Sequence, residues 1–298
     1  ADASALQAKR HLILPGANYL NLPTSPPPDP GRVRRPRVAV PGNRLRPDAF
    51  CGRGPYMVGM KVRGERECRE CGTHWSYYDT GSIVCPQCGS VRSVGIDERT
   101  EHTATTAEFD LTTVRGMVDE VPLSELAGEV ESVAADYVRR IGFIHAGELL
   151  PLDDVYLAAL ELRHVAAEVN RAMRVSDAEE RYFFALLGGA DEGDRPAPAE
   201  VPDSLRGARG LAAATAVDTY ATEVRQYLDD HPDRTPSQLL GTLGEHRKRV
   251  AALDGEVTPR TAERLVRVAQ DLGRAVAEDD ETALARAQQR LDELSVEV

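Results

Sequence analysis

The chain has 298 residues, of which 42% are hydrophobic and only 5% are aromatic. This length corresponds to one to three domains, and a core built from Ala, Leu and Val favours helices over a β-sandwich. No run of about 18 apolar residues and no secretory signal is evident, so we expect a cytoplasmic protein that does not span a membrane.

The net charge of −12 is unevenly distributed along the chain. Residues 1–59 hold nine Lys or Arg and three Asp, for a charge of +6, and the rest of the chain carries −18. Only three of the 36 basic residues are lysine. An acidic surface poor in lysine is typical of proteins in molar salt, where carboxylates are strongly screened. A GC-rich genome, which favours arginine codons, is the alternative explanation.

Residues 1–59 differ in composition from everything that follows. They contain ten of the 19 prolines and no Glu. Such a segment buries too little apolar surface to offset its ordering entropy, so we predict disorder. It is either a basic arm for nucleic acid or an upstream stretch that is not native, with the natural start near Met60 or Met57.

Four of the five cysteines form two close pairs, whereas Cys51 stands alone in the proline-rich segment. The pattern is Cys68-x-x-Cys71, thirteen residues, and then Cys85-x-x-Cys88. Four thiolates complete a tetrahedral Zn²⁺ shell, so the spacing predicts one structural zinc ion in a ribbon that depends on it for folding. A rubredoxin-like iron site and a redox dithiol fit less well, because the first uses a longer insert and the second needs one pair.

The knuckle sequences Cys68-Arg69-Glu70-Cys71-Gly72 and Cys85-Pro86-Gln87-Cys88-Gly89 resemble those of transcription-factor-IIB-type zinc ribbons. From Met60 to Val298 the chain also resembles uncharacterised haloarchaeal proteins that join such a ribbon to a helical region. This resemblance implies zinc binding and a halophilic archaeal origin, but no activity. Residues 1–59 depart from it.

The predicted fold class is mainly α, with a small β zinc ribbon followed by a multi-helix array. Strands are expected at 61–67, 73–78 and 91–96, and a polar connector at 100–110. The predicted domains are a disordered segment at 1–59, the ribbon at 60–98, a helical domain at 111–188, an acidic linker at 189–203 and a second helical domain at 204–298.

Local signals mark several helix starts. Ser176 to Glu179 is a capping box, and Thr235-Pro236 and Thr258-Pro259 each place a cap before a proline. Four helices are expected after the linker. The apolar run around Tyr182, Phe183, Phe184 and Leu187 should dock the earlier helices together.

Trp75, Tyr77 and Tyr78 are expected along one strand, either as the ribbon's own core or as a platform that stacks bases. Six basic and six acidic residues at 61–99 make the ribbon neutral overall, so it is not expected to form a basic patch. A neutral module on an acidic body suggests a contact surface.

No pattern in the chain predicts catalysis. Glu161-x-x-His164, with Glu168 one turn later, has the spacing of a di-iron motif but lacks a second copy, so a solvated helix face is the better interpretation. His145 and His246 lack metal-ligand spacing. We therefore expect a zinc-binding cytoplasmic adaptor that contacts a protein partner through the ribbon. The alternative is a nucleic-acid-binding regulator of transcription or translation, and the third is an enzyme with an unrecognised site.

Overall fold

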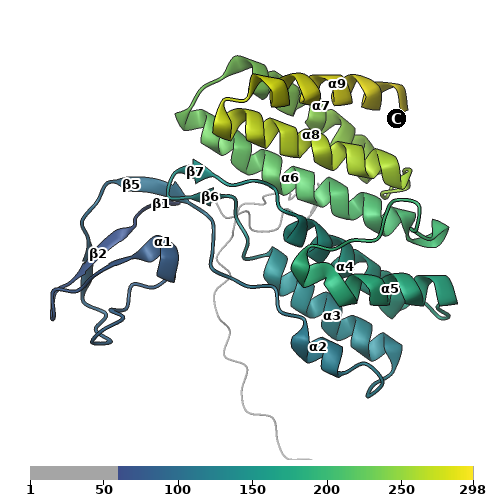
Figure 1. Cartoon of the computed structure of the whole chain (residues 1–298), viewed down its shortest axis with the longest axis horizontal. Coiled ribbons are helices and arrows are strands. Elements are labelled where there is room, and N and C mark those ends of the chain that lie inside the picture. Colours follow the sequence, from purple (N-terminus) through teal and green to yellow (C-terminus); the bar gives the residue numbers. More distant parts are fainter. Residues whose placement is uncertain (1–59, 298) are drawn as a thin grey trace, which may run out of the picture. The chain divides into compact units, whose positions relative to one another are not determined.

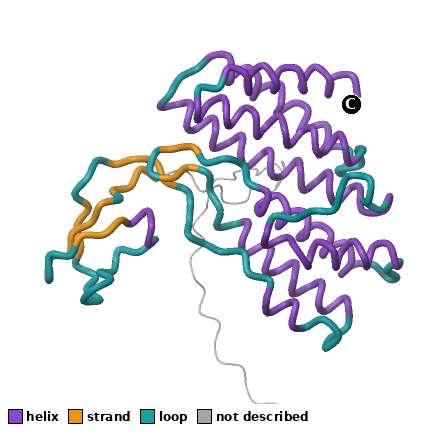
Figure 2. The backbone as a smooth tube through the Cα atoms, viewed as in Figure 1, coloured by secondary structure: helices purple, strands orange, loops and turns teal. Residues whose placement is uncertain are grey.

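A computed structural model describes residues 60–297 of the chain, so Cys51 and the predicted disorder of residues 1–59 lie outside the described range. A small β region at the start of this range is followed by a helical array, and the predicted fold class is confirmed. Figure 1 shows the two regions in chain order, and Figure 2 separates their strands from their helices.

The ribbon is built from five short strands in two sheets. A three-stranded sheet has the order β3-β2-β4, and β1 pairs with β5, all antiparallel. Their bounds are Met60–Arg63 for β1, Glu65–Cys68 for β2, His74–Ser76 for β3, Ser93–Gly95 for β4 and Arg99–His102 for β5. The predicted first strand is interrupted at Gly64, and β5 occupies the start of the predicted polar connector.

Gly64 ends β1 at a point where no side chain can be accommodated, because a Cβ there would collide with the ring of Tyr78. The next strand therefore belongs to the other sheet. The sequence did not predict β5, because its residues are mostly charged or polar. None of them is buried, so the strand lacks the apolar pattern by which strands are recognised.

After the ribbon, the chain forms a β-hairpin and eight helices, which Figure 1 colours from teal to yellow. The hairpin consists of β6 (Ile144–His145) and β7 (Glu148–Leu149). The helices are α2 (Thr112–Gly116), α3 (Leu123–Val138), α4 (Asp154–Arg171), α5 (Asp177–Gly189), α6 (Arg206–Asp230), α7 (Arg234–Ala252), α8 (Pro259–Glu278) and α9 (Glu281–Glu297). The four helices expected after the linker are α6 to α9.

Two of the three predicted caps are confirmed. Ser176 and Glu179 form the capping box of α5, and the Thr258 hydroxyl accepts from the Thr261 N–H at the start of α8. The cap predicted at Thr235 is wrong, because the Asp233 side chain accepts from the Thr235 N–H and α7 begins at Arg234. Asp233 precedes the helix and its side chain can accept from a free backbone N–H, whereas Thr235 already lies within the first turn of α7.

One hydrophobic core unites the helices of both predicted helical domains. α4 packs against α3, α5 and α6, and α6 in turn packs against α7 and α8. Tyr182, Phe183 and Leu187 are buried in this core, and Phe184 packs against it, as predicted. Among residues 60–297, no helix is long and apolar enough to cross a membrane.

The segment predicted as a flexible acidic linker packs onto the helices instead. Ala190 and Val201 are buried in the core, and short 3-10 turns occupy Ala190–Glu192 and Asp203–Leu205. Arg195 forms salt bridges to Glu161 at 3.3 Å and to Glu263 at 3.1 Å. The composition of this segment suggested a linker. It could not reveal these ion pairs, because they join residues that are far apart in sequence.

A buried glutamate of α6 holds the chain where it passes from the ribbon to the helices. Glu223 Oε2 accepts from the Thr103 hydroxyl at 2.6 Å and from the Phe143 N–H at 2.5 Å. The N–H groups of Thr103 and Ala104 donate to the Ile144 carbonyl, at 2.8 and 2.9 Å. Burial raises the pKa of the Glu223 carboxyl, and the hydrogen bond from Thr103 counteracts this effect.

The Glu223→Ala variant should destabilise the chain by about 2–5 kcal/mol, because two buried donors lose their acceptor. Glu223→Gln keeps an acceptor and should be close to neutral.

Since burial raises the folded-state pKa of Glu223, the stability that Glu223 contributes is greatest below the pKa of an unfolded glutamate and is lost as the pH rises through the folded-state pKa. Glu223→Gln should abolish this loss, and thermal unfolding followed by circular dichroism across pH measures both effects. Equal melting temperatures for the two variants would contradict the assignment.

Candidate metal centre

Each cysteine pair lies in a knuckle with the same backbone hydrogen bonds. In the first, the Cys68 N–H donates to the Thr73 carbonyl at 2.9 Å, and the Gly72 N–H donates to the Cys68 carbonyl at 3.0 Å. The second repeats these bonds from Cys85 to Ser90 and from Gly89 to Cys85, at 2.9 and 3.0 Å. Gly72 and Gly89 have φ values of +72° and +70°, a conformation that glycine adopts without strain.

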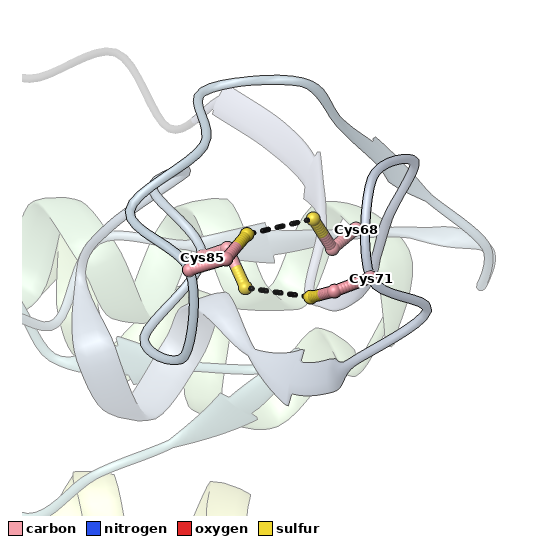
Figure 3. A group of neighbouring side chains, drawn as sticks. Cys68, Cys71 and Cys85 are labelled. Carbon is pink, nitrogen blue, oxygen red and sulfur yellow. Dashed lines mark hydrogen bonds between the residues drawn. The ribbon is translucent and has the colours of Figure 1, made fainter.

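The two knuckles bring all four predicted sulfurs together, as Figure 3 shows for the labelled Cys68, Cys71 and Cys85. Sγ atoms of Cys68 and Cys88 lie 3.6 Å apart, and those of Cys71 and Cys85 lie 3.7 Å apart. All four lie within 4.8 Å of one another. A tetrahedral ion with bonds of about 2.3 Å to sulfur requires an edge of about 3.8 Å. The site therefore has the size and symmetry to hold one metal ion with four sulfur ligands.

The pKa values of the thiols depend on the neighbouring sulfurs and on local hydrogen bonds. Hydrogen bonds from the Thr73 side chain and backbone lower the pKa of the Cys71 thiol to about 6. At Cys88 the Ser90 backbone N–H lowers the pKa, but the neighbouring sulfurs of Cys71 and Cys68 outweigh it and raise the value to about 12. Four adjacent thiols thus do not all ionise at neutral pH by themselves, whereas a coordinated cation deprotonates its ligands.

The ribbon has a very small core of its own, made of Cys68, Cys85 and Trp75. Trp75 is buried, and its indole N–H donates to the Ser82 carbonyl at 3.0 Å. This packing confirms the interpretation of Trp75 as a core residue. A three-residue core supplies little burial energy, so a metal ion held by the four cysteines would stabilise the ribbon.

Tyr77 and Tyr78 do not continue the strand of Trp75 as predicted. They open a single helical turn, α1 (Tyr77–Thr80), which Ser76 caps and Gly81 ends in a left-handed conformation. The sequence Asp79-Thr80-Gly81 provides the end of this helix. Tyr78 then reaches β1 and β5, because its hydroxyl donates to the Val62 carbonyl at 3.2 Å and lies 2.5 Å from the Thr100 hydroxyl.

The charges of the ribbon balance in number but are segregated in space. Four basic side chains, Lys61, Arg63, Arg66 and Arg99, line one cavity of about 370 Å³ that has no acidic residue in its lining. The prediction that the ribbon forms no basic patch is therefore wrong at this point. Counting charges along the sequence missed it, because β1 and β5 lie side by side although nearly forty residues separate them.

Glu161 and His164 do not lie on a solvated helix face, so that interpretation is wrong. Glu161 is only 1% exposed and accepts from the hydroxyl of Tyr182. His164 Nε2 is buried without a hydrogen-bond partner, and burial, together with the charges of Arg163 and Arg171, lowers its pKa to about 4. Glu168 alone is exposed, in a pair with Arg171. Glu161 is stabilised by cations from distant segments, which helix periodicity does not reveal.

His102, His145 and His246 do not belong to the cysteine cluster. His145 and His102 have ring centroids 5.2 Å apart, and His246 Nε2 lies 3.4 Å from the Ser295 hydroxyl. Within residues 60–297, only the four cysteines group three or more potential ligand atoms closely enough to hold a metal ion. The four cysteines predicted as ligands therefore form the candidate set, which includes no described histidine.

Comparison with known proteins relates the chain to one family. No curated protein and no solved structure matches the chain. A family model described as "Family of unknown function (DUF7117)" matches residues 60–291, which include the ribbon and nearly all of the helical array. The chain belongs to this family of unknown function, DUF7117.

Proposed function

We propose that this chain is a zinc-dependent interaction protein whose ribbon contacts a protein partner. The observation that carries the proposal is the location of exposed apolar side chains. Of the seven large hydrophobic residues that stand exposed in the described part of the chain, four belong to the ribbon: Ile83, Val84, Val91 and Ile96. Exposed aliphatic side chains concentrated on a small module are typical of interaction surfaces.

Zinc is the metal that this site favours. Four thiolates in a tetrahedral arrangement suit zinc, and a closed shell of four protein ligands leaves no position for a substrate. The role that follows is structural, and the proposed function is binding rather than catalysis. The thiols also require a reducing compartment such as the cytoplasm, where unpaired cysteines persist.

The ribbon presents its apolar residues on a rigid support. Val91 and Ile96 flank β4, and Ser93 between them is fixed by a hydrogen bond from its hydroxyl to the Ile83 carbonyl at 2.7 Å. The Ile96 N–H donates to the Glu65 carbonyl at 2.8 Å. Because these positions are ordered by backbone bonds and by the metal, a partner would bind them without a large cost in conformational entropy.

The test compares the wild-type chain with Val91→Ser/Ile96→Ser and with the control Met173→Ser/Leu253→Ser, which removes two exposed apolar residues from the helical array. Nuclease-treated extracts of the source cells supply candidate partners, and each is purified and titrated against all three proteins. We expect a direct partner whose affinity falls at least about tenfold for the ribbon variant and stays unchanged for the control. Equal affinities for all three proteins, or a partner that nuclease removes, would contradict the proposal. Metal analysis of the purified wild type checks that zinc, not iron, is bound.

A further inference from the structure

The cavity lined by Lys61, Arg63, Arg66 and Arg99 lies at the base of the ribbon, between its two sheets. Its other lining residues are Val62, Tyr77, Ile83 and Gly95. A volume of about 370 Å³ is within the range of small-ligand sites. The cavity thus combines four cations, one aromatic ring and two aliphatic side chains.

Two of the four cations face each other across a strand pair. In the antiparallel register of β1 and β5, Arg63 lies directly opposite Arg99. Like charges in this position destabilise a strand pair, because their side chains leave the same face at a short distance. A sequence under no other constraint would place a carboxylate at one of the two positions, as it does at the neighbouring pair of Lys61 and Glu101.

Carboxylates do not neutralise this arginine pair within residues 60–297. Lys61 forms a salt bridge to Asp230 at 2.7 Å, but Arg63, Arg66 and Arg99 form none with a described acidic residue. The Asp97 carboxylate forms no salt bridge to this pair: Oδ2 accepts from the Gly64 N–H at 3.0 Å, and Oδ1 is buried without a hydrogen-bond partner among the described residues. Arg63 reaches only the Asp97 backbone carbonyl.

The backbone around the cavity accommodates these side chains. Arg66 lies opposite Gly95 in the register of β2 and β4, so the residue across from it contributes no side chain of its own. Arg63 crosses over the same glycine, and a Cβ at position 95 would overlap the Arg63 Cβ. Arg66 is held in place by hydrogen bonds to the Ser93 hydroxyl at 3.0 Å and the Ser93 carbonyl at 3.4 Å. Gly95 therefore lets two arginines approach one point.

We propose that this cavity binds the phosphate of a nucleotide, either free or as part of a single-stranded nucleic acid. Guanidinium groups bind phosphate oxygens through paired N–H donors, and an anion between Arg63 and Arg99 would relieve their repulsion. Tyr77 supplies the ring on which a base stacks, as in other sites for single strands. The inference is tested separately from the proposed protein contact: Ile83 belongs to both surfaces, but Val91 and Ile96, which the partner test replaces, do not line the cavity.

The test uses the full-length, metal-loaded chain and fluorescent twelve-residue oligo(dT) and oligo(rU) in anisotropy titrations. Two substituted proteins are compared with the wild type. Arg63→Gln/Arg99→Gln removes the facing pair, and the control Arg69→Gln/Arg92→Gln removes the same charge from ribbon arginines outside the cavity. Zinc content and the melting temperature verify that each protein is folded.

We expect the cavity variant to weaken binding at least about tenfold and the control to change it less than about threefold. The slope of log K against log salt should become shallower by about 0.7 for each phosphate that the variant no longer neutralises. Because the facing arginines repel each other, the ligand-free cavity variant should also melt at the same temperature as the wild type or higher. Arg63→Lys/Arg99→Lys keeps the charge and should still weaken binding, since lysine lacks the paired donors.

Competition identifies the source of the phosphate. Displacement by AMP at the affinity of the oligonucleotide assigns a free nucleotide, and displacement only by longer strands assigns nucleic acid. Three results would overturn the proposal: no binding of AMP or either strand, equal losses of affinity in the cavity and control variants, or displacement by a poly-glutamate peptide as effective as by AMP or strand. The last result would assign the cavity to an acidic protein segment.

Discussion

Removal of the metal with a chelator is expected to unfold the ribbon while the helical array stays folded. The ribbon's own core consists of three residues, and two of them are predicted metal ligands, so we expect metal binding to supply most of its folding free energy. Structural zinc sites contribute about 10–16 kcal/mol of apparent binding free energy at neutral pH, far more than so small a core. The helices have a separate and much larger core, which does not include the cysteines.

Trp75 makes this experiment specific to the ribbon. It is the single tryptophan of the chain and is buried against Cys68 and Cys85. Metal loss should shift its fluorescence emission to longer wavelength, with little change in circular dichroism at 222 nm. Cys85→Ser/Cys88→Ser should show the shifted emission without a chelator, and Cys51→Ser, which keeps all four ligands, should behave as the wild type. An unshifted emission in the chelated protein would contradict metal-dependent folding of the ribbon.

Replacement of Arg209 by methionine should lower the free energy of unfolding by about 3–5 kcal/mol, which corresponds to a melting temperature roughly 10 °C lower. Arg209 is 3% exposed and lies 3.3 Å from Glu161 and 3.2 Å from Glu263. It also donates to the Tyr182 hydroxyl at 3.1 Å and to the Pro196 carbonyl at 2.9 Å. Without the guanidinium, Glu161 keeps only Arg195 as a cationic partner in a site that excludes water.

A double-mutant cycle separates this effect from the loss of packing. Glu161→Gln/Arg209→Met removes both charges and should recover part of the stability lost in Arg209→Met, because the unpaired buried carboxylate is gone. The control Arg171→Met breaks an exposed pair with Glu168 and should cost less than about 1 kcal/mol. Thermal unfolding of the wild type, Glu161→Gln, Arg209→Met and the double variant measures the coupling. If Arg209→Met were no more destabilising than Arg171→Met, the network would not stabilise the fold.

The metal centre was predictable because its geometry is local. Two residues between paired cysteines, with glycine after the second, determine a knuckle whose hydrogen bonds close within six residues. The capping box at Ser176 and the Thr258 cap were predictable for the same reason. The helix-rich fold class followed from composition and periodicity, since amphipathic helices show their buried face in a single stretch of sequence.

The features that escaped prediction all depend on residues distant in the chain. Arg195 was assigned to a linker because its partners, Glu161 and Glu263, lie 34 and 68 positions away. Glu161 was assigned to a solvated face because the cations that permit its burial come from the same distant segments. Tyr77 and Tyr78 were placed on a strand because their β-propensity says nothing about the cap that Ser76 provides or about the space at Gly64.

The sequence by itself determined which four cysteines come together as the candidate metal centre, because the two knuckles require only the correct side chains at a short, regular spacing. It also determined the mainly helical class, through local periodicity. Only the tertiary structure decided where charge accumulates: β1 and β5 place Arg63 opposite Arg99, and folded helices place Glu161 between Arg195 and Arg209. Electrostatic energy depends on distance in space and on exclusion of water, and neither quantity is encoded by separation along the chain.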